Sequence, residues 1–159
     1  MIATKIRIKS IKLLVFTEVF YFAKGRNECS MVPKFRAFLK RGGEMAKVIE
    51  LNFEGSWTCC EPYVAVEGTC DLIPLRECEL MWSSGLKDRN DVEIFEGDIC
   101  LDVYNDVYGI VIFTNGCFIC EWEYHFEDLF EVIEDVQVVG NICEDPELLE
   151  LVDRVKMEK

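Results

Sequence analysis

The chain has 159 residues, of which 50% are hydrophobic and 12% aromatic, which is enough for one compact core or two small ones. Its net charge of −13 is unevenly spread, because residues 1–47 carry a local +8 and residues 48–159 a local −21. A body this acidic repels a phosphate backbone, which disfavours direct nucleic-acid binding, and no apolar run is long enough to cross a membrane.

The first thirty residues differ in kind from those that follow. They are basic, lack capping or turn patterns, and end in the polar stretch KGRNECS before Met31. Apolar residues 13–23 follow basic ones, as in a secretory signal, but Glu18 interrupts them and no small-residue cleavage site is present. We expect residues 1–30 to come from a wrongly assigned start, with a flexible basic arm as the alternative.

Residues 34–53 have the pattern of a β-hairpin. The side chains of residues 35–40 alternate with the two-residue period of a half-buried strand. Gly42 and Gly43 supply the positive φ angles that a tight turn needs. Glycines and prolines divide residues 54–79 into short pieces, among which YVAVEG is the best strand candidate.

Two turns follow in the segment SSGLKDRNDVEIFEGDIC. Residues 85–91 include Asp88 and Asn90, whose side chains bond their own backbone in turns and tolerate left-handed conformations. After a short strand, residues 96–98 form a second bend, in which glycine admits a conformation that other residues resist. We expect this bend to lead into a strand over 99–103, with the carboxylate of the bend bonding nearby amides.

The remainder of the chain has the pattern of short strands followed by one helix. YGIVIF and CFICEW flank the strong hairpin pattern TNGC, and EDVQVVGNI contains the last strand. The segment EWEYHFEDLFEVIED is ambiguous, and we expect a loop with a short helical turn near residues 126–130. In the tail, Asp145 caps a helix, Pro146 occupies its first position, and residues 148–155 provide an apolar face.

This order of short, tightly connected strands predicts a mainly β protein built around an SH3-like barrel of small antiparallel strands. We divide the chain into an N-terminal extension (1–30), an N-terminal hairpin subdomain (31–79) and a barrel subdomain with a short C-terminal helix (80–159). Short strands leave exposed edges, which subunits often cover by pairing, so we expect a homo-oligomer.

Three segments, KFRAF, GLKDRNDVEIFEGDIC and VVGNICEDPELLE, resemble blocks of the YopX family of phage and prophage proteins. Members of that family carry a Gly-Leu-Lys-Asp-Lys-Asn-Gly turn, a Tyr-Glu-Gly-Asp-Ile strand entry and an Ile-Gly-Asn-Ile closing strand. The blocks keep their order and spacing, so the resemblance spans about residues 34–150. This chain departs from the family with Asp91 at the turn glycine, Phe95 at the tyrosine and Val139 before the closing Gly-Asn pair.

The resemblance implies a mostly β fold encoded by a mobile genome. It brings no established activity, no cofactor and no catalytic residue to this chain. The positions that it singles out belong to turns and strand entries, and we regard them as structural: Gly85, Leu86, Asp88, Asn90, Glu96, Gly97, Asp98, Ile99, Gly140 and Asn141.

Nine cysteines raise the question of a disulfide, metal or redox role. An odd number argues against a paired disulfide framework, and without export we expect free, buried thiols in a cytoplasmic protein. Cys117 and Cys120 form a Cys-x-x-Cys, with Cys59 and Cys60 upstream, but no second such pair completes a four-ligand zinc site. Residues three apart in a strand also point to opposite faces, so buried thiols are favoured and metal binding stays open.

The remaining polar and aromatic candidates do not form a catalytic pattern. His125, the single histidine, is interpreted as a boundary residue, because no nucleophile pattern accompanies it. The aspartates between residues 88 and 102 lack the spacing of an EF-hand loop. We expect the three tryptophans to be core or interface anchors: Trp57, Trp82 and Trp122.

Two functions of different classes follow, and neither is enzymatic. The first is a phage or prophage accessory protein of the host cytoplasm, a β module that binds an unknown host or phage protein or assembles with itself. The second is an acidic inhibitor that mimics nucleic acid and blocks a host or defence protein, which rests on the local −21. A mimic would show its carboxylates as a double row at phosphate spacing. A third alternative, which is enzymatic, is a metal-dependent hydrolase.

Overall fold

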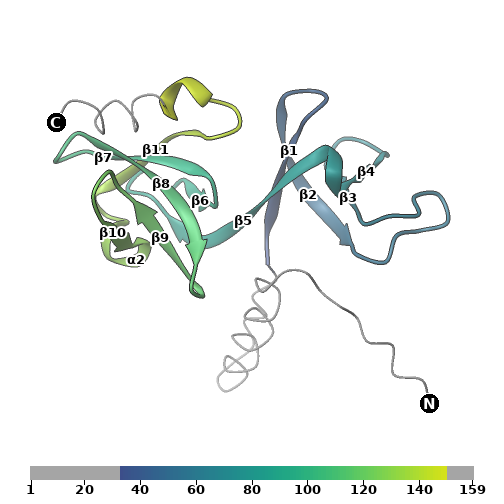
Figure 1. Cartoon of the computed structure of the whole chain (residues 1–159), viewed down its shortest axis with the longest axis horizontal. Helices are drawn as coiled ribbons and strands as arrows, with labels where there is room; N and C mark the ends of the chain where they lie inside the picture. The colour runs from purple at the N-terminus through teal and green to yellow at the C-terminus, as the bar shows by residue number, and fades with distance from the viewer. Residues whose placement is uncertain (1–32, 150–159) are drawn as a thin grey trace, which may run out of the picture. The chain divides into compact units, whose positions relative to one another are not determined.

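The computed structural model describes residues 33–149 (Figure 1). The predicted extension over residues 1–30 and residues 150–159 of the tail lie outside the described residues. Within the described range, eleven strands form two antiparallel sheets, accompanied by one 3-10 helix, one short α-helix and the first residues of a helix that begins at residue 146. The prediction of a mainly β protein is therefore confirmed.

The first sheet contains six strands in the order β4-β3-β2-β1-β5-β6. β1 and β2 pair around a turn, which confirms the predicted hairpin, but of the two glycines only Gly43, with a φ of 68°, has the predicted positive φ. The predicted strand YVAVEG is β3, which pairs with β2 and β4. The bounds are β1 (Phe35–Leu39), β2 (Glu44–Asn52), β3 (Tyr63–Val66), β4 (Leu72–Pro74), the 3-10 helix η1 (Leu75–Glu77), β5 (Cys78–Lys87) and β6 (Glu93–Phe95).

The second sheet contains five strands in the order β10-β9-β8-β7-β11. Asn115 and Gly116 have φ angles of 51° and 86° between β8 and β9, as the hairpin pattern TNGC predicts. The bounds are β7 (Asp98–Asp102), β8 (Val107–Thr114), β9 (Cys117–Glu121), β10 (Phe126–Asp128), the helix α2 (Leu129–Val132) and β11 (Val136–Asn141).

The ambiguous segment before β11 is only partly as predicted. A short helix is present, but α2 begins at Leu129, where Asp128 caps it by accepting the N–H of Phe130 at 2.9 Å. The residues before it are not a loop, because Phe126–Asp128 pairs with β9. The alternating aromatic and acidic residues of this stretch suit either conformation, and pairing with β9 decides between them.

Both sheets stay open in the part of the chain that the structure describes, so the closed SH3-like barrel is not confirmed. Their outer strands are β4 and β6 in the first sheet and β10 and β11 in the second. The long strand β5 pairs with β1 through residues 78–82 and with β6 through residues 83–87 (Figure 1). A strand shared in this way extends the first sheet instead of closing a barrel.

Apolar side chains gather in two core clusters. The first-sheet core contains Ala37, Val64, Val66 and Cys78, and the second-sheet core contains Ile94, Cys100, Val111, Cys120, Trp122, Leu129 and Val136. Because Ile94 belongs to β6, the end of the first sheet packs into the second-sheet core. The clusters fall on either side of the proposed division between residues 79 and 80, but β5 runs across it, and the division stays a prediction.

The chain turns after β11 and begins a helix at residue 146, as the tail pattern predicts. The Asp145 carboxylate, which the pattern predicts as a helix cap, accepts the backbone N–H of Asn141 at 2.9 Å. A Cβ added at Gly140 would lie 2.6 Å from Leu148 Cδ1 and 2.7 Å from Asp145 Oδ2, so glycine permits this close packing. Among residues 33–149, no helix has the length and apolar composition to span a bilayer.

Candidate functional site

Asp98 lies where the three segments that resemble the family come together. Its carboxylate, in a residue only 1% exposed, forms an ion pair with Arg36 of β1. The same carboxylate accepts the backbone N–H of Phe95 at 2.7 Å and the side-chain amide of Asn141 at 3.3 Å. The guanidinium of Arg36 also lies over the Phe95 ring, 4.5 Å from its centroid. We call Arg36, Asp98 and Asn141 the Asp98 junction, because they connect β1, β7 and β11.

The bend before Asp98 completes this junction. Gly97 has a φ of 83°, and its carbonyl accepts the side-chain amide of Asn141 at 2.8 Å and the N–H of Ile142 at 3.0 Å. A Cβ at this position would lie 3.2 Å from Ile142 Cδ1. The predicted bend and the predicted bond from Asp98 to a nearby amide are therefore both present.

The electrostatics of the junction point to a structural role. Burial raises the pKa of Asp98, although the charge of Arg36 and the N–H of Phe95 act in the opposite direction. A raised carboxyl pKa is also typical of a general acid. Here both carboxylate oxygens are occupied by donors of the protein and the residue is buried, so a substrate cannot reach them.

A second polar cluster surrounds Asp88. One carboxylate oxygen accepts the N–H groups of Asn90 and Val92 at 2.8 and 2.9 Å, and the other accepts the N–H of Val138 at 2.9 Å. The turn is therefore attached to β11. Asp91 has a φ of 67°, which explains how an aspartate replaces the turn glycine of the family, since aspartate tolerates this region better than most residues.

The surroundings of the other positions singled out by the resemblance also indicate structural roles. Gly85, with a φ of 76°, lies in β5 where the pairing with β6 shifts register, and Leu86 packs against the second-sheet core. Glu96 donates its N–H to the Trp82 carbonyl at 2.8 Å, and Ile99 is fully buried. The ten positions thus belong to two turns, to strands that these turns join, and to β11, which pairs with β7.

The cysteines divide into buried and exposed thiols. Cys78, Cys100 and Cys120 are buried, but Cys60, Cys70 and Cys117 are exposed, so the prediction of buried thiols is wrong for these three. Each of the three lies in or beside a turn or loop, where the chain offers no core to cover it. Cys117 and Cys120 differ in burial, as expected for residues on opposite faces of a strand.

The environment of Cys78 and Cys120 favours the protonated form of these two buried thiols. A hydrogen bond with Cys100, together with burial, raises the pKa of Cys120, and burial raises the pKa of Cys78. Within residues 33–149, no group of three or more His, Cys, Asp or Glu side chains is arranged to hold a metal ion.

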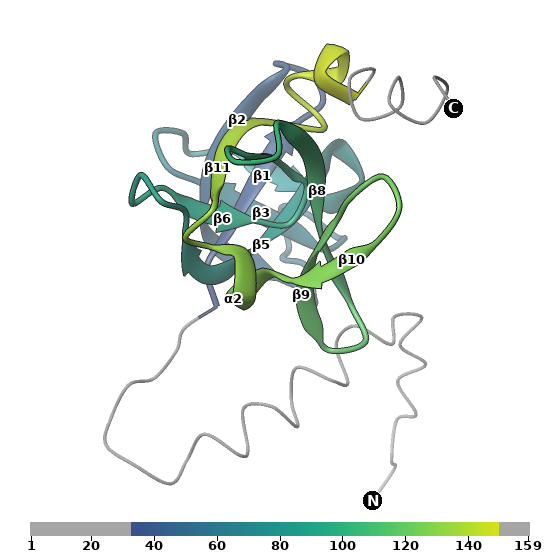
Figure 2. The same ribbon diagram turned by 90° about the vertical axis from the view of Figure 1, so that its left-hand side faces the viewer.

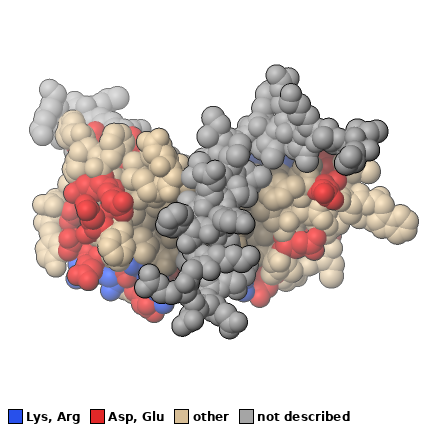
Figure 3. Space-filling model, turned by 90° about the horizontal axis from the view of Figure 1, so that it is seen from below, with Lys and Arg blue, Asp and Glu red and all other residues tan. Residues whose placement is uncertain are grey.

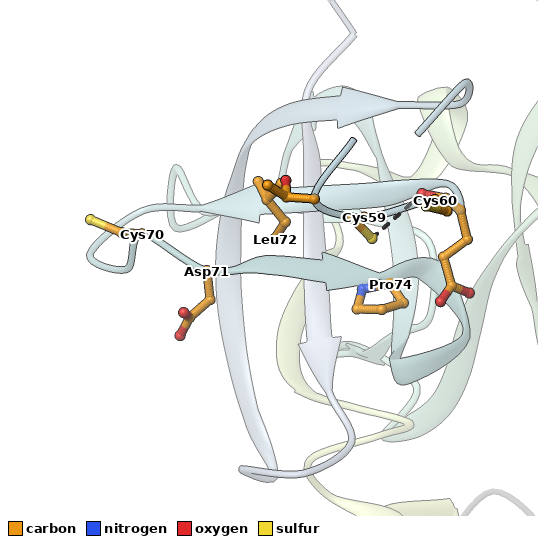
Figure 4. Close-up of a pocket in the computed structure, with 8 residues that line it drawn as sticks. Cys59, Cys60, Cys70, Asp71, Leu72 and Pro74 are labelled. Carbon is orange, nitrogen blue, oxygen red and sulfur yellow. Dashed lines mark hydrogen bonds between the residues drawn. The ribbon is translucent and has the colours of Figure 1, made fainter. Parts of the chain in front are cut away.

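A hollow of about 730 Å³ lies beside β4, and Figure 4 shows its lining. Cys59 donates to the Glu61 carbonyl at 3.6 Å, whereas Cys70 points away from Cys59 and Cys60 (Figure 4). The Glu61 carboxylate forms an ion pair with Arg76. The polar groups therefore do not converge on one point, as a ligand site would require. The lining residues are Thr58, Cys59, Cys60, Glu61, Cys70, Asp71, Leu72 and Pro74.

The family model described as YopX protein matches residues 34–150. The chain belongs to the YopX family. The crystal structure of protein EF1440 from Enterococcus faecalis is similar, with 26% identity and a TM-score of 0.52 over 76% of this chain and 99% of that chain. No curated protein matches the chain.

This YopX protein exposes aromatic side chains at two places. Trp57, in the loop after β2, is 96% exposed, so it is not a core anchor and the alternative of an interface anchor stays a prediction for it, whereas Trp122 is buried in the second-sheet core. Phe126 of β10 and Phe130 of α2 are 64% and 69% exposed. Local pattern did not identify these two phenylalanines as surface residues, although three aromatic residues and four carboxylates between residues 123 and 131 could have done so.

Hydrogen bonds stabilise the loop that carries Trp57. The side chain of Asn52 accepts the N–H groups of Glu54 and Gly55 at 2.9 and 3.0 Å. Ser56 and Cys59 exchange two further bonds, from the Ser56 N–H to the Cys59 carbonyl and from the Cys59 N–H to the Ser56 hydroxyl. The indole is thus presented to solvent on a fixed backbone.

Charge is segregated along the sequence of this family member. Residues 90–149 contain sixteen Asp and Glu residues and no Lys or Arg. Figure 3, which views the molecule from below, shows Asp and Glu gathered at the end that contains β10 and α2 in Figure 1, with Lys and Arg at the margin of that area. His125 lies at the surface and contacts Glu127, with 3.4 Å between Nε2 and the carboxylate.

Proposed function

We propose that this YopX protein is a non-enzymatic phage or prophage accessory protein of the host cytoplasm, a β module that binds a protein partner or assembles with itself. The observation that carries the proposal is the exposure of Trp57, Phe126 and Phe130 on an ordered backbone. Large aromatic side chains held in water are typical anchors of protein interfaces. A fixed backbone lowers the ordering cost of binding.

The polar clusters support a binding protein over an enzyme. Asp88 and Asp98 are the most deeply buried carboxylates among residues 33–149, and backbone amides or Arg36 occupy their oxygens. Burial raises the pKa of the core thiol Cys78, which disfavours the thiolate that nucleophilic chemistry needs. Each of these groups has a structural role that accounts for its position.

The proposal is tested by measuring mass and capturing partners with the full chain. We expect either a mass above that of the monomer by light scattering at micromolar concentration, or a specific partner retained from host lysate. The Trp57→Ser and Phe130→Ser variants should weaken whichever association occurs, whereas Val92→Ser, at another exposed apolar position, should not. A monomer that retains nothing specific would contradict the proposal.

A second candidate, the nucleic-acid mimic, is supported by the sixteen carboxylates without Lys or Arg over residues 90–149. A mimic competes with DNA or RNA for the same basic groove, and its complex weakens steeply with salt. We would add duplex DNA and then increasing NaCl to a captured complex. Release by both favours mimicry, whereas release by neither favours the aromatic interface.

A further inference from the structure

β10 forms an outer edge of the second sheet. It pairs with β9 through residues 126–128 on one side, and no described strand pairs with its other side. An edge strand of this kind presents backbone N–H and C=O groups that a further strand can bond. β10 is followed directly by α2, and Figures 1 and 2 both show the two elements beside β9.

Phe126 of β10 and Phe130 of α2 are exposed, and the residues between them are buried or hydrogen-bonded. Leu129, between β10 and the rest of α2, is fully buried in the second-sheet core. Asp128 caps the helix through the N–H of Phe130, so the backbone around both rings is ordered. The rings of Phe126 and Phe130 therefore offer apolar contact area without a large ordering cost.

The charge around these rings selects the kind of partner. Asp128, Glu131, Glu134 and Asp135 are exposed, and none of them forms an ion pair with a Lys or Arg within residues 33–149. A second copy of this edge would bring the same carboxylates into contact, which disfavours self-pairing here. A basic partner would neutralise them instead.

We propose that β10 and α2 form a docking face for an extended basic segment of another protein. The segment adds a strand to the free edge of β10, lays apolar side chains over Phe126 and Phe130, and pairs its Lys or Arg with the surrounding carboxylates. This inference rests on the proposed function, because it specifies the partner of the same β module.

The test uses an eight-residue peptide of alternating arginine and valine with blocked ends, titrated into the full chain at 50 mM NaCl. A control peptide has the same charge but proline in place of every second valine, which removes backbone donors. We expect the first peptide to bind about tenfold more tightly than the control, and to slow amide exchange in residues 126–128.

Variants separate specific docking from general attraction to an acidic protein. Phe130→Ser and, as a second variant, Glu131→Lys should each weaken binding about tenfold, whereas Val92→Ser, the control variant of the proposed function, should leave it unchanged. Circular dichroism checks that each variant is folded. Equal affinity for the two peptides, or equal affinity of the variants, would overturn the docking face.

The outcome also separates this inference from the proposed function. If neither peptide binds but the full chain still captures a partner that Trp57→Ser releases, the docking face is wrong and the binding function stands. If the full chain neither assembles nor captures a partner and the peptides do not bind either, both proposals fail.

Discussion

Single residues explain why the turns of this protein are where the sequence predicts them. Gly97 combines a φ of 83° with a neighbour, Ile142, that leaves little room for a side chain. Turn chemistry predicts that Asp98 bonds a nearby amide, and its bond to the N–H of Phe95 confirms this. Its partner Arg36 lies 62 residues earlier, and a local pattern carries no information on contacts at that separation.

Replacing Gly97 tests the strain at the bend. Gly97→Val should lower the free energy of unfolding by about 1–3 kcal/mol, because a branched side chain must adopt a positive φ and displace Ile142. Urea unfolding measures the change. Gly68→Val is a matched control, since Gly68 has a φ of 90° but no neighbour within 4 Å of an added Cβ. An unchanged midpoint for Gly97→Val would contradict the strain.

A double-mutant cycle tests the Asp98 junction. Asp98→Ala should lower the free energy of unfolding by about 3–5 kcal/mol, because it leaves the mostly buried Arg36 without its counter-charge. Arg36→Met should also destabilise, since it leaves Asp98 buried and unpaired. The double variant should lose about 0.5–3 kcal/mol less than the two single losses added together. Strict additivity in urea unfolding would show that the pair is not coupled.

Secondary structure elements were predictable where the deciding interactions are local. The hairpins follow from turn residues and from the alternation of side chains. Each of these patterns is complete within about ten consecutive residues. The sequence does not predict β10, because the alternating aromatic and acidic residues that lead into it fit a loop as well, and pairing with β9 decides the outcome. The barrel could not be established from sequence, because closure depends on which distant edges meet.

The contact between β11 and the tail helix gives a prediction at this scale. Gly140→Ala places a methyl group against Leu148 and Asp145 and should cost about 1–3 kcal/mol of unfolding free energy. Adding Leu148→Ala should recover part of that loss, because the shorter side chain makes room for the methyl group. Thermal and urea unfolding of the single and double variants measure both effects. If the double variant is less stable than the two losses predict, the contact is not the cause.

The whole molecule separates its charges along the chain. All Lys and Arg residues within 33–149 lie at or before Arg89, whereas sixteen carboxylates follow it. Net charge of one sign disfavours the compact state through self-repulsion. The composition predicted this imbalance, but the ion pair between Arg36 and Asp98, which joins the basic and acidic parts, became visible only in the folded chain.

Salt should therefore stabilise the protein. Raising NaCl from 20 to 500 mM screens repulsion between exposed carboxylates and should raise the melting temperature by about 2–4 °C. The Glu131→Gln/Glu134→Gln variant should melt higher at low salt and respond less to NaCl. Sucrose at equal osmolarity controls for solvent effects that do not depend on charge. A melting temperature that falls with NaCl would show that attractive pairs dominate.

The continuity of β5 restricts where recombination can divide the gene of this family member. Residues 78–82 bond to β1 and residues 83–87 bond to β6, so one uninterrupted strand serves both halves. A gene fragment ending between residues 79 and 80 would encode two residues of that strand and leave β1 without most of its partner. Recombination at this point would succeed only between relatives whose β1, β5 and β6 are compatible. Between relatives whose strands do not match, the two cores are therefore inherited together.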